Sequence, residues 1–260
     1  HGEGSRAMWT GLYPGRTEDA VPIGHITNGV HVPTWLAPQM SRLYDRHLGV
    51  GWLEHSGEAP VWEGIESVDD AELWETQLTV KARLVDFVRR RAIDQATLRS
   101  DPQEVTSRLA RIMSPDALTI GFARRFATYK RANLLLADIE RLALMVNDPK
   151  RPVQFVFAGK AHPKDEAGKA YLKELVSKIR EYGLEDRMVV LEDYDMYLAR
   201  VLTHGSDVWL NTPRRPMEAS GTSGMKAAMN GTLNLSIPDG WWVEGYRPEV
   251  GWSIGTGEEY

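Results

Sequence analysis

The run L-T-I-G-F-A, at residues 118–123, has the length and apolar composition of a buried β-strand. A second such run, V-Q-F-V-F-A, follows at residues 153–158, and a helix-like pattern over residues 132–146 separates the two. The alternation continues with helices predicted at 164–182 and 194–202 and strands at 188–191, 207–211 and 232–237. Almost wholly apolar strands that alternate with helices predict a parallel sheet covered on both faces. Residues 115–240 are therefore expected to form a doubly wound, Rossmann-like α/β fold.

The segment before this alternation has another pattern, irregular with short helical pieces. Thr27-Asn28-Gly29 is a turn signal after a short apolar strand. Helices are predicted over residues 70–98 and over about residues 102–113. We therefore expect a helical and irregular interdomain segment at residues 1–114 and a Rossmann-like domain at residues 115–260.

The composition excludes several classes of protein. The 260 residues carry a net charge of −5, which argues against a nucleic-acid-binding surface. There is no cysteine, so disulfides and thiolate chemistry are excluded, and a reducing, cytoplasmic location is expected. No apolar run reaches the roughly 18 residues of a membrane span. His25 and His31 lack the further ligands that would complete a metal site, so none is predicted.

The stretch E-A-S-G-T-S-G-M-K-A-A-M-N-G, at residues 218–231, combines small residues with a helix-like run. Glycines let the backbone approach a ligand closely, and a helix that starts near Met225 would add a positive dipole end. The N–H groups of Thr222, Ser223 and Gly224 would then cradle a phosphate, with Lys226 beside it as a charge or a nucleophilic amine. The alternative is a glycine-rich helix start with one solvated lysine.

Cationic residues follow the predicted strands and should gather at one edge of the sheet. They occur in the segments Arg124-Arg125, Tyr129-Lys130-Arg131, Gly159-Lys160 and Asn211-Thr212-Pro213-Arg214-Arg215-Pro216. Because like charges repel, such a cluster predicts bound anions, and two phosphate groups would satisfy it. The alternative is that Arg131 and Arg215 face solvent.

These motifs resemble those of the α-glucan (glycogen, starch and maltodextrin) phosphorylase family. In that family the lysine of a G-T-x-x-M-K run holds pyridoxal 5′-phosphate (PLP) as a Schiff base, and it corresponds to Lys226. Long-type members read G-T-G-N-M-K, whereas G-T-S-G-M-K here is similar to the shorter bacterial and archaeal branch. The opening H-G-E-G-S-R-A-M-W also resembles a family segment, except that Gly4 replaces an apolar residue.

The resemblance implies a role for each matching residue. The residues expected to bind the cofactor are Lys226, Thr222, Ser223, Arg124 and Tyr194. The residues expected to take part in catalysis are Lys226, Arg125 and Lys130, the last two as ligands of the substrate phosphate. Glucose hydroxyls are expected to contact Asn28, Glu218, Ser220 and Gly221. Arg124 stands where long-type members have lysine, which keeps the charge and changes its geometry.

The family's reaction is the phosphorolysis of terminal α-1,4-linked glucose to glucose 1-phosphate with retention, and it needs no carboxylate pair. The resemblance implies the C-terminal domain of a two-domain GT-B-type glycosyltransferase, whose N-terminal domain would be the partner across the cleft. We therefore expect this chain alone to be inactive. Two alternatives remain: a nucleotide-sugar glycosyltransferase of the starch- or glycogen-synthase type, and a non-catalytic module that binds phosphate or glucan.

Overall fold

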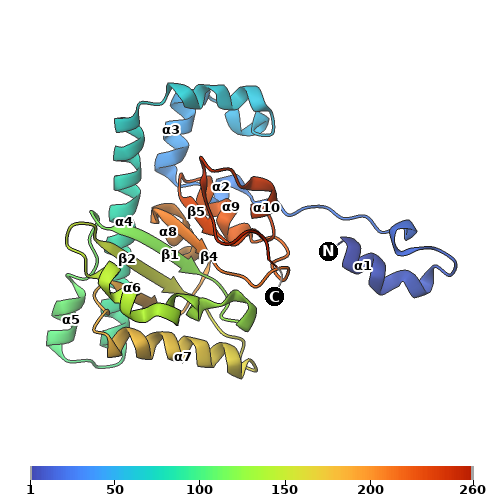
Figure 1. Cartoon of the computed structure of the whole chain (residues 1–260). Coiled ribbons are helices and arrows are strands. Elements are labelled where there is room, and N and C mark those ends of the chain that lie inside the picture. The colour runs from blue at the N-terminus through green and yellow to red at the C-terminus, as the bar shows by residue number, and fades with distance from the viewer. Residues whose placement is uncertain (1, 259–260) are drawn as a thin grey trace.

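Six parallel strands form one sheet in the computed structural model, which describes residues 2–258. The strands are β1 (Leu118–Ala123), β2 (Val153–Ala158), β3 (Met188–Leu191), β4 (Val208–Asn211), β5 (Leu233–Ser236) and β6 (Gly251–Ser253). Their order across the sheet is β3-β2-β1-β4-β5-β6, so the order reverses between β1 and β4 (Figure 1). This is the strand order of a doubly wound dinucleotide-binding fold, and it confirms the predicted fold class.

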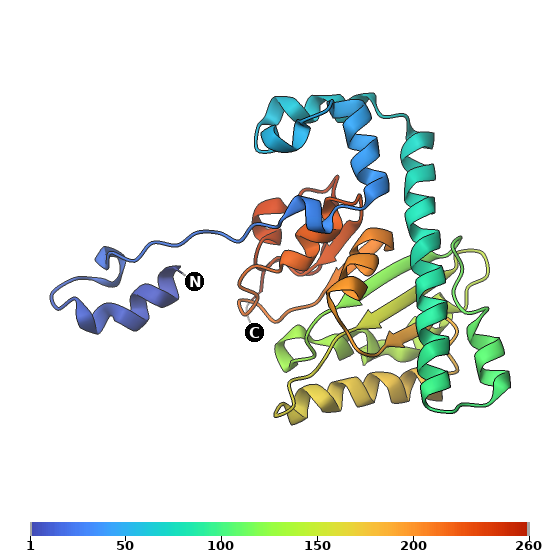
Figure 2. The same ribbon diagram turned by 180° about the vertical axis from the view of Figure 1, so that it is seen from behind.

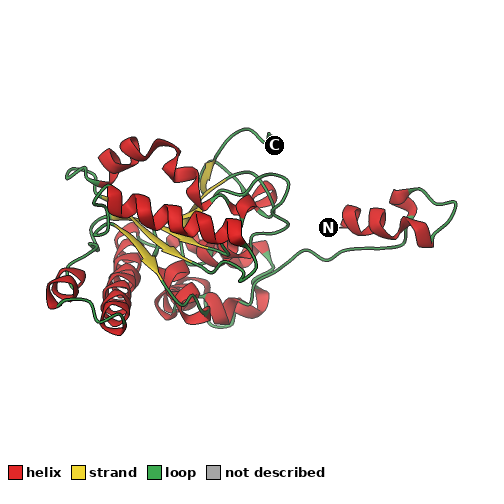
Figure 3. Cartoon of the chain, turned by 90° about the horizontal axis from the view of Figure 1, so that it is seen from below, coloured by secondary structure: helices red, strands yellow, loops and turns green. Residues whose placement is uncertain are grey.

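Helices cover both faces of the sheet because successive strand side chains point to opposite sides. Phe122, Phe155 and Phe157 pack on one face, against α6 (Ile139–Val146) and α7 (Glu166–Glu181). On the other face lie α4 (Asp70–Leu98), α8 (Met196–Gly205) and α9 (Thr222–Ala228). Figure 3 shows the strands between these two layers of helices.

Helix α4 joins the first part of the chain to the sheet. Asp69 caps its start, because the carboxylate accepts hydrogen bonds from the Ala71 and Glu72 N–H groups. One half of α4 packs on the sheet through Leu84 and Val88. Near its start it lies beside α3 (Pro38–Leu48), where Met40, Leu43 and Val80 belong to a separate apolar cluster (Figure 2). The remaining elements of this part are α5 (Gln103–Leu109) and the 3₁₀ helices η3 (Trp52–His55) and η4 (Ala59–Ser67).

Residues 2–30 form an arm (Figure 1). Helix α1 (Gly2–Trp9) and the short helices η1 (Thr10–Leu12) and η2 (Glu18–Ala20) stand away from the sheet in Figures 1 and 2. An extended segment connects them to α2 (Val32–Trp35). No strand precedes Thr27 in the described chain, so that prediction was wrong. The apolar residues there have no neighbouring strand to pair with, and the Ile26 side chain is fully solvent-exposed.

Three other elements differ from expectation. The predicted helix over residues 132–146 is a 3₁₀ turn, η6 (Ala132–Asp138), followed by α6. The helix at residues 102–113 is shorter, ending at Leu109. Strand β6 was not predicted because three residues are too few to show a pattern. It pairs with β5, and Gly251 of β6 lies close to the Asn234 carbonyl of β5. The division of the chain at residues 114 and 115 stays a prediction. No helix of the described chain has the length and apolarity needed to cross a membrane.

Candidate functional site

The candidate site lies where the strand order reverses, at the carboxyl ends of β1 and β4. Open α/β sheets bind ligands in the crevice at this switch point. Strand β1 leads directly into Arg124, and the short 3₁₀ helix η5 (Thr128–Lys130) follows. Strand β4 leads into the loop that carries Glu218. The backbone just after β2 lies close to the backbone just after β1. A Cβ added to Gly159, which follows β2, would lie only 1.9 Å from the Arg124 carbonyl oxygen.

A buried ion cluster joins the two loops. The Glu218 carboxylate accepts a hydrogen bond from Arg124 Nη2 at 2.6 Å, and the same oxygen accepts from the Lys130 ammonium. The Arg124 side chain is 4% exposed, and those of Glu218 and Lys130 are 10% exposed. Two cations share one carboxylate, which leaves a net charge of about +1 in a place that excludes most water. Arg124 Nη1 is also buried, with no hydrogen-bond partner among residues 2–258. The cluster therefore has a positive charge and a spare donor available to an anion.

The structure shows which groups of the protein compensate the predicted cations. Glu218, which was expected to contact glucose, is the protein's own counter-charge for two of them. Arg131 donates to the carbonyls of Thr212 and Pro213, and Arg215 to the carbonyl of Gly257, so neither is simply solvent-facing. Lys160 is exposed. Bound anions are thus not needed to offset the whole set of charges, because the protein offsets part of it.

Arg125 lies outside the buried cluster. Its side chain is exposed, and Nη2 approaches the Tyr129 hydroxyl at 3.4 Å. Tyr194, by contrast, lies near Arg124: burial raises the pKa of its hydroxyl, and the Arg124 charge acts in the opposite direction. Tyr194 also packs against the sheet core. The structure therefore brings together Arg124, Lys130 and Tyr194 and leaves Arg125 at the rim.

The small-residue loop ends in α9, which begins at Thr222 and not near Met225 as predicted. Gly221 precedes it with φ of 78°, a left-handed conformation that glycine adopts without strain. The Gly224 N–H donates to the Gly221 carbonyl at 3.1 Å, so it is not available to a ligand, contrary to the prediction. The Ser223 hydroxyl accepts from Trp209 Nε1 at 3.2 Å. Thr222 and Ser223 are both partly exposed at the start of the helix.

Lys226 is not a freely solvated lysine. It is half-buried, and its Nζ lies 3.8 Å from the centroid of the Trp35 ring. Removal of water by burial lowers the pKa of the ammonium, which favours the neutral, nucleophilic amine. Asn230 fixes this arrangement from within the protein: its Nδ2 donates to the carbonyls of both Trp35 and Lys226. Trp35 was missed from sequence, because nothing in the local pattern relates it to Lys226, and Asn230 was given no role although it lies in the same stretch.

A small cavity of about 180 Å³ lies beside the loop and contains predicted glucose contacts from distant parts of the chain. Asn28 lines it from the arm, and Ser220 lines it from the loop. The Ser220 hydroxyl is buried and has no hydrogen-bond partner in the described chain. Asn28 and Ser220 therefore line the same cavity, and what these residues bind stays a prediction.

Asp239 and Trp241 support this loop and were also missed. The Asp239 carboxylate accepts from the Glu218 N–H at 2.8 Å, and burial raises the pKa of that carboxyl group. The Trp241 N–H donates to the Ser220 carbonyl at 2.7 Å. The turn signal Pro238-Asp239-Gly240 could have pointed to Asp239, because aspartate in such turns binds nearby backbone N–H groups.

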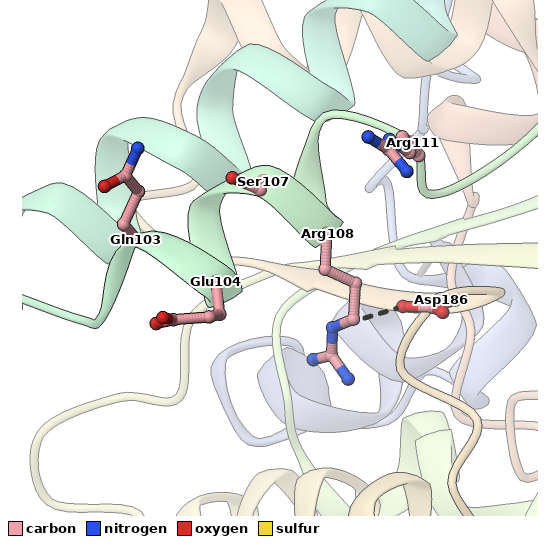
Figure 4. A pocket seen from close by; sticks show the side chains of 6 residues that line it. All are labelled: Gln103, Glu104, Ser107, Arg108, Arg111 and Asp186. Carbon is pink, nitrogen blue, oxygen red and sulfur yellow. Dashed lines mark ion pairs between the residues drawn. The ribbon is translucent and has the colours of Figure 1, made fainter.

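A larger hollow of about 650 Å³ lies elsewhere, against α5. Figure 4 shows Arg108 turned toward Asp186 across it, with a separation of 3.5 Å between Nε and Oδ1. None of the predicted site residues lines this hollow. Within the described residues, no group of three or more histidine and carboxylate side chains is placed to hold a metal ion.

Comparison with known proteins places these features in a family. A family model described as carbohydrate phosphorylase matches residues 17–252. The chain is 48% identical to a maltodextrin phosphorylase of Thermococcus litoralis, over 98% of this chain and 30% of that protein. It is 43% identical to a glycogen phosphorylase of Aquifex aeolicus, over 99% of this chain and 37% of that protein. A glycogen phosphorylase of Mycobacterium tuberculosis is 46% identical, over 98% of this chain and 29% of that protein. The chain spans about a third of the length of these relatives. It belongs to the carbohydrate phosphorylase family.

Proposed function

We propose that this chain is the PLP- and phosphate-binding part of an α-glucan phosphorylase, which transfers terminal α-1,4-linked glucose to phosphate with retention. The observation that carries the proposal is Lys226, a half-buried lysine with a lowered pKa in the matched region. The relatives are named for maltodextrin and glycogen, which supports an α-glucan as the substrate class.

The residues present fit PLP. An aldehyde cofactor needs an uncharged amine, and desolvation of Lys226 favours that form. Its phosphate needs donors, and Arg124 Nη1 is a buried donor without a partner in residues 2–258. Tyr194, half-buried beside Arg124, supplies an aromatic ring at the same edge of the sheet. When bound, PLP supplies a phosphate group that exchanges a proton with the substrate phosphate.

The chain's own residues would bind and orient the reactants. In the proposal, Arg124 holds the cofactor phosphate, and Lys130 and Arg125 hold the substrate phosphate. Arg124 and Lys130, which pair with Glu218, are positioned before the reaction, so they stabilise developing charge without reorganisation. Asn28 and Ser220, which line one cavity, orient the glucosyl hydroxyls. Exposed Arg125 is free to follow a phosphate that enters from solvent.

The test is covalent capture of PLP. The chain is incubated with PLP, reduced with borohydride to fix the bond between aldehyde carbon and lysine nitrogen, digested, and mapped by mass spectrometry. We expect saturable label at Lys226, none at that position in Lys226→Arg, and unchanged label in Lys169→Arg, an exposed lysine. Because the chain spans about a third of its relatives' length, cofactor capture is a better readout than turnover.

Three outcomes would contradict the proposal. Label spread over exposed lysines without saturation at Lys226 would show that the site does not select PLP. Binding of UDP-glucose in calorimetry, together with absence of the Lys226 label, would favour a nucleotide-sugar glycosyltransferase. Binding of maltodextrin or phosphate without the label would favour a non-catalytic binding module.

A further inference from the structure

A third cavity, of about 410 Å³, lies against the edge strand β3. Its walls come from α4, α5, α7 and β3, and they are mainly apolar. Ile112 and Met188 are fully buried there, and Val176 of α7 is partly exposed. This size and a mainly apolar wall are typical of sites that bind a small organic molecule. None of the predicted phosphorylase residues lines the cavity.

One polar side chain in the wall has an unmet hydrogen-bonding requirement. Gln95 of α4 is 7% exposed, and its amide nitrogen Nε2 is buried with no partner among residues 2–258. A buried amide without a partner destabilises a protein, so such groups are uncommon without a ligand or water. The terminal torsion of glutamine is broad, so a small rotation can turn the N–H toward the cavity. An acceptor inside the cavity would satisfy it.

The charged residues that line the cavity do not favour an ionic ligand over a neutral one. Arg99 is paired with Asp101 at 3.0 Å and with Glu192 at 2.9 Å, so its charge is already compensated. The other charged residues that line the cavity, Arg180 and Glu185, have opposite signs. A neutral molecule therefore enters without losing or gaining a strong electrostatic interaction.

We propose that this cavity binds a small, uncharged and mainly apolar molecule that presents one hydrogen-bond acceptor to Gln95. The apolar walls supply the favourable burial, and the Gln95 amide selects an acceptor over a hydrocarbon. The site is independent of the proposed PLP chemistry, so either proposal stands if the other fails.

Three probes of one size test the proposal. Acetophenone has a ring and one carbonyl acceptor, ethylbenzene has the ring without an acceptor, and benzoate has a negative charge. Binding is measured by ligand-observed NMR and by the side-chain amide signal of Gln95 in ¹⁵N-labelled protein. We expect acetophenone to bind about fivefold more tightly than ethylbenzene, the effect of one net hydrogen bond. Benzoate is expected to bind more weakly than either.

Three variants locate the binding. Gln95→Met keeps side-chain length and removes the donor, so acetophenone and ethylbenzene should then bind equally. Val176→Trp, at a partly exposed position, should fill the cavity and abolish binding of both. Gln103→Met, an exposed glutamine on α5, is the control and should bind like the wild type. Thermal unfolding confirms that each variant is folded.

Several results would overturn the proposal. They are absence of binding by acetophenone at its solubility limit, equal binding of acetophenone and ethylbenzene to the wild type, and undiminished binding to Val176→Trp. Tighter binding of benzoate would assign the cavity to anions instead. If Gln95→Met proves unstable, the amide shift in the wild type and Val176→Trp still decide the result.

Discussion

Replacing Glu218 by glutamine tests whether this carboxylate is the protein's own counter-charge for the phosphate-binding cations. Glu218→Gln keeps the shape and one acceptor oxygen but removes the charge. Arg124 and Lys130, at 4% and 10% exposure, would then be left buried with no compensating anion in their cluster. Removing one partner of a buried ion pair costs about 3–5 kcal/mol, and because the glutamine oxygen still accepts, we expect about 3 kcal/mol. For a chain of this size that lowers the unfolding temperature by on the order of 10 °C.

The same variant should respond to phosphate more strongly than the wild type. Inorganic phosphate can supply the negative charge that the carboxylate no longer provides, and at a tenfold excess over its dissociation constant it adds about 1.4 kcal/mol of stability. The assay is thermal unfolding in phosphate and in chloride at equal ionic strength. Glu181→Gln is the matched control, because Glu181 forms an exposed ion pair with Lys178 that contributes at most about 1 kcal/mol. If Glu218→Gln unfolds like the wild type, or phosphate stabilises both proteins equally, the carboxylate does not compensate these cations.

Further predictions concern single groups. The pKa of Lys226 is lowered by burial, whereas a hydrogen bond to a carboxylate raises that of Lys178, so the ratio of PLP label at Lys226 to label at Lys178 should rise as pH falls from about 10 to about 8. A constant ratio in quantitative mass spectrometry would contradict this. Burial lowers the pKa of His204 to about 4 from 6.5, so the unfolded chain takes up a proton first as pH falls. Stability should therefore drop between pH 6.5 and about pH 4, by about 2 kcal/mol after allowance for solvent screening, and urea unfolding of His204→Asn should lack this part of the slope. Gly159→Ala would place a Cβ 1.9 Å from a backbone carbonyl oxygen, so it should lower the free energy of unfolding in urea by more than about 2 kcal/mol. Gly57→Ala adds a Cβ in open space and should change that free energy little. Equal effects of the two substitutions would contradict the steric argument.

The strands were the most predictable part of the fold. Bounds of β1, β2 and β3 agree with the predicted ranges, because a buried parallel strand is a continuous apolar run between helical patterns. The short strand β6 was not predicted, since three residues carry no periodic signal, and the 3₁₀ turn η6 was predicted as part of an α-helix because its residues continue the helix-like pattern of α6. The arm was misjudged at Ile26 because an apolar residue in sequence does not reveal whether a partner is available to bury it.

For the site, the sequence predicted only which strand each residue follows. That placed Arg124 and Lys130 at the correct edge of the sheet, but the pairing of both with Glu218 depends on side-chain directions across two loops. The Trp35 ring over Lys226 depends on contacts between segments almost two hundred residues apart. Such contacts follow from tertiary packing, which local periodicity does not contain.

The reversal of strand order between β1 and β4 also bears on the order of folding events. These neighbouring strands are separated in the sequence by β2, β3 and three α-helices, so their pairing closes a long loop. Contacts of such high sequence separation form slowly. Arg124 and Glu218 meet only across this junction. The ion cluster is therefore a marker of completed folding: a chain that has built only β1, β2 and β3 has the cations but not the carboxylate that joins them.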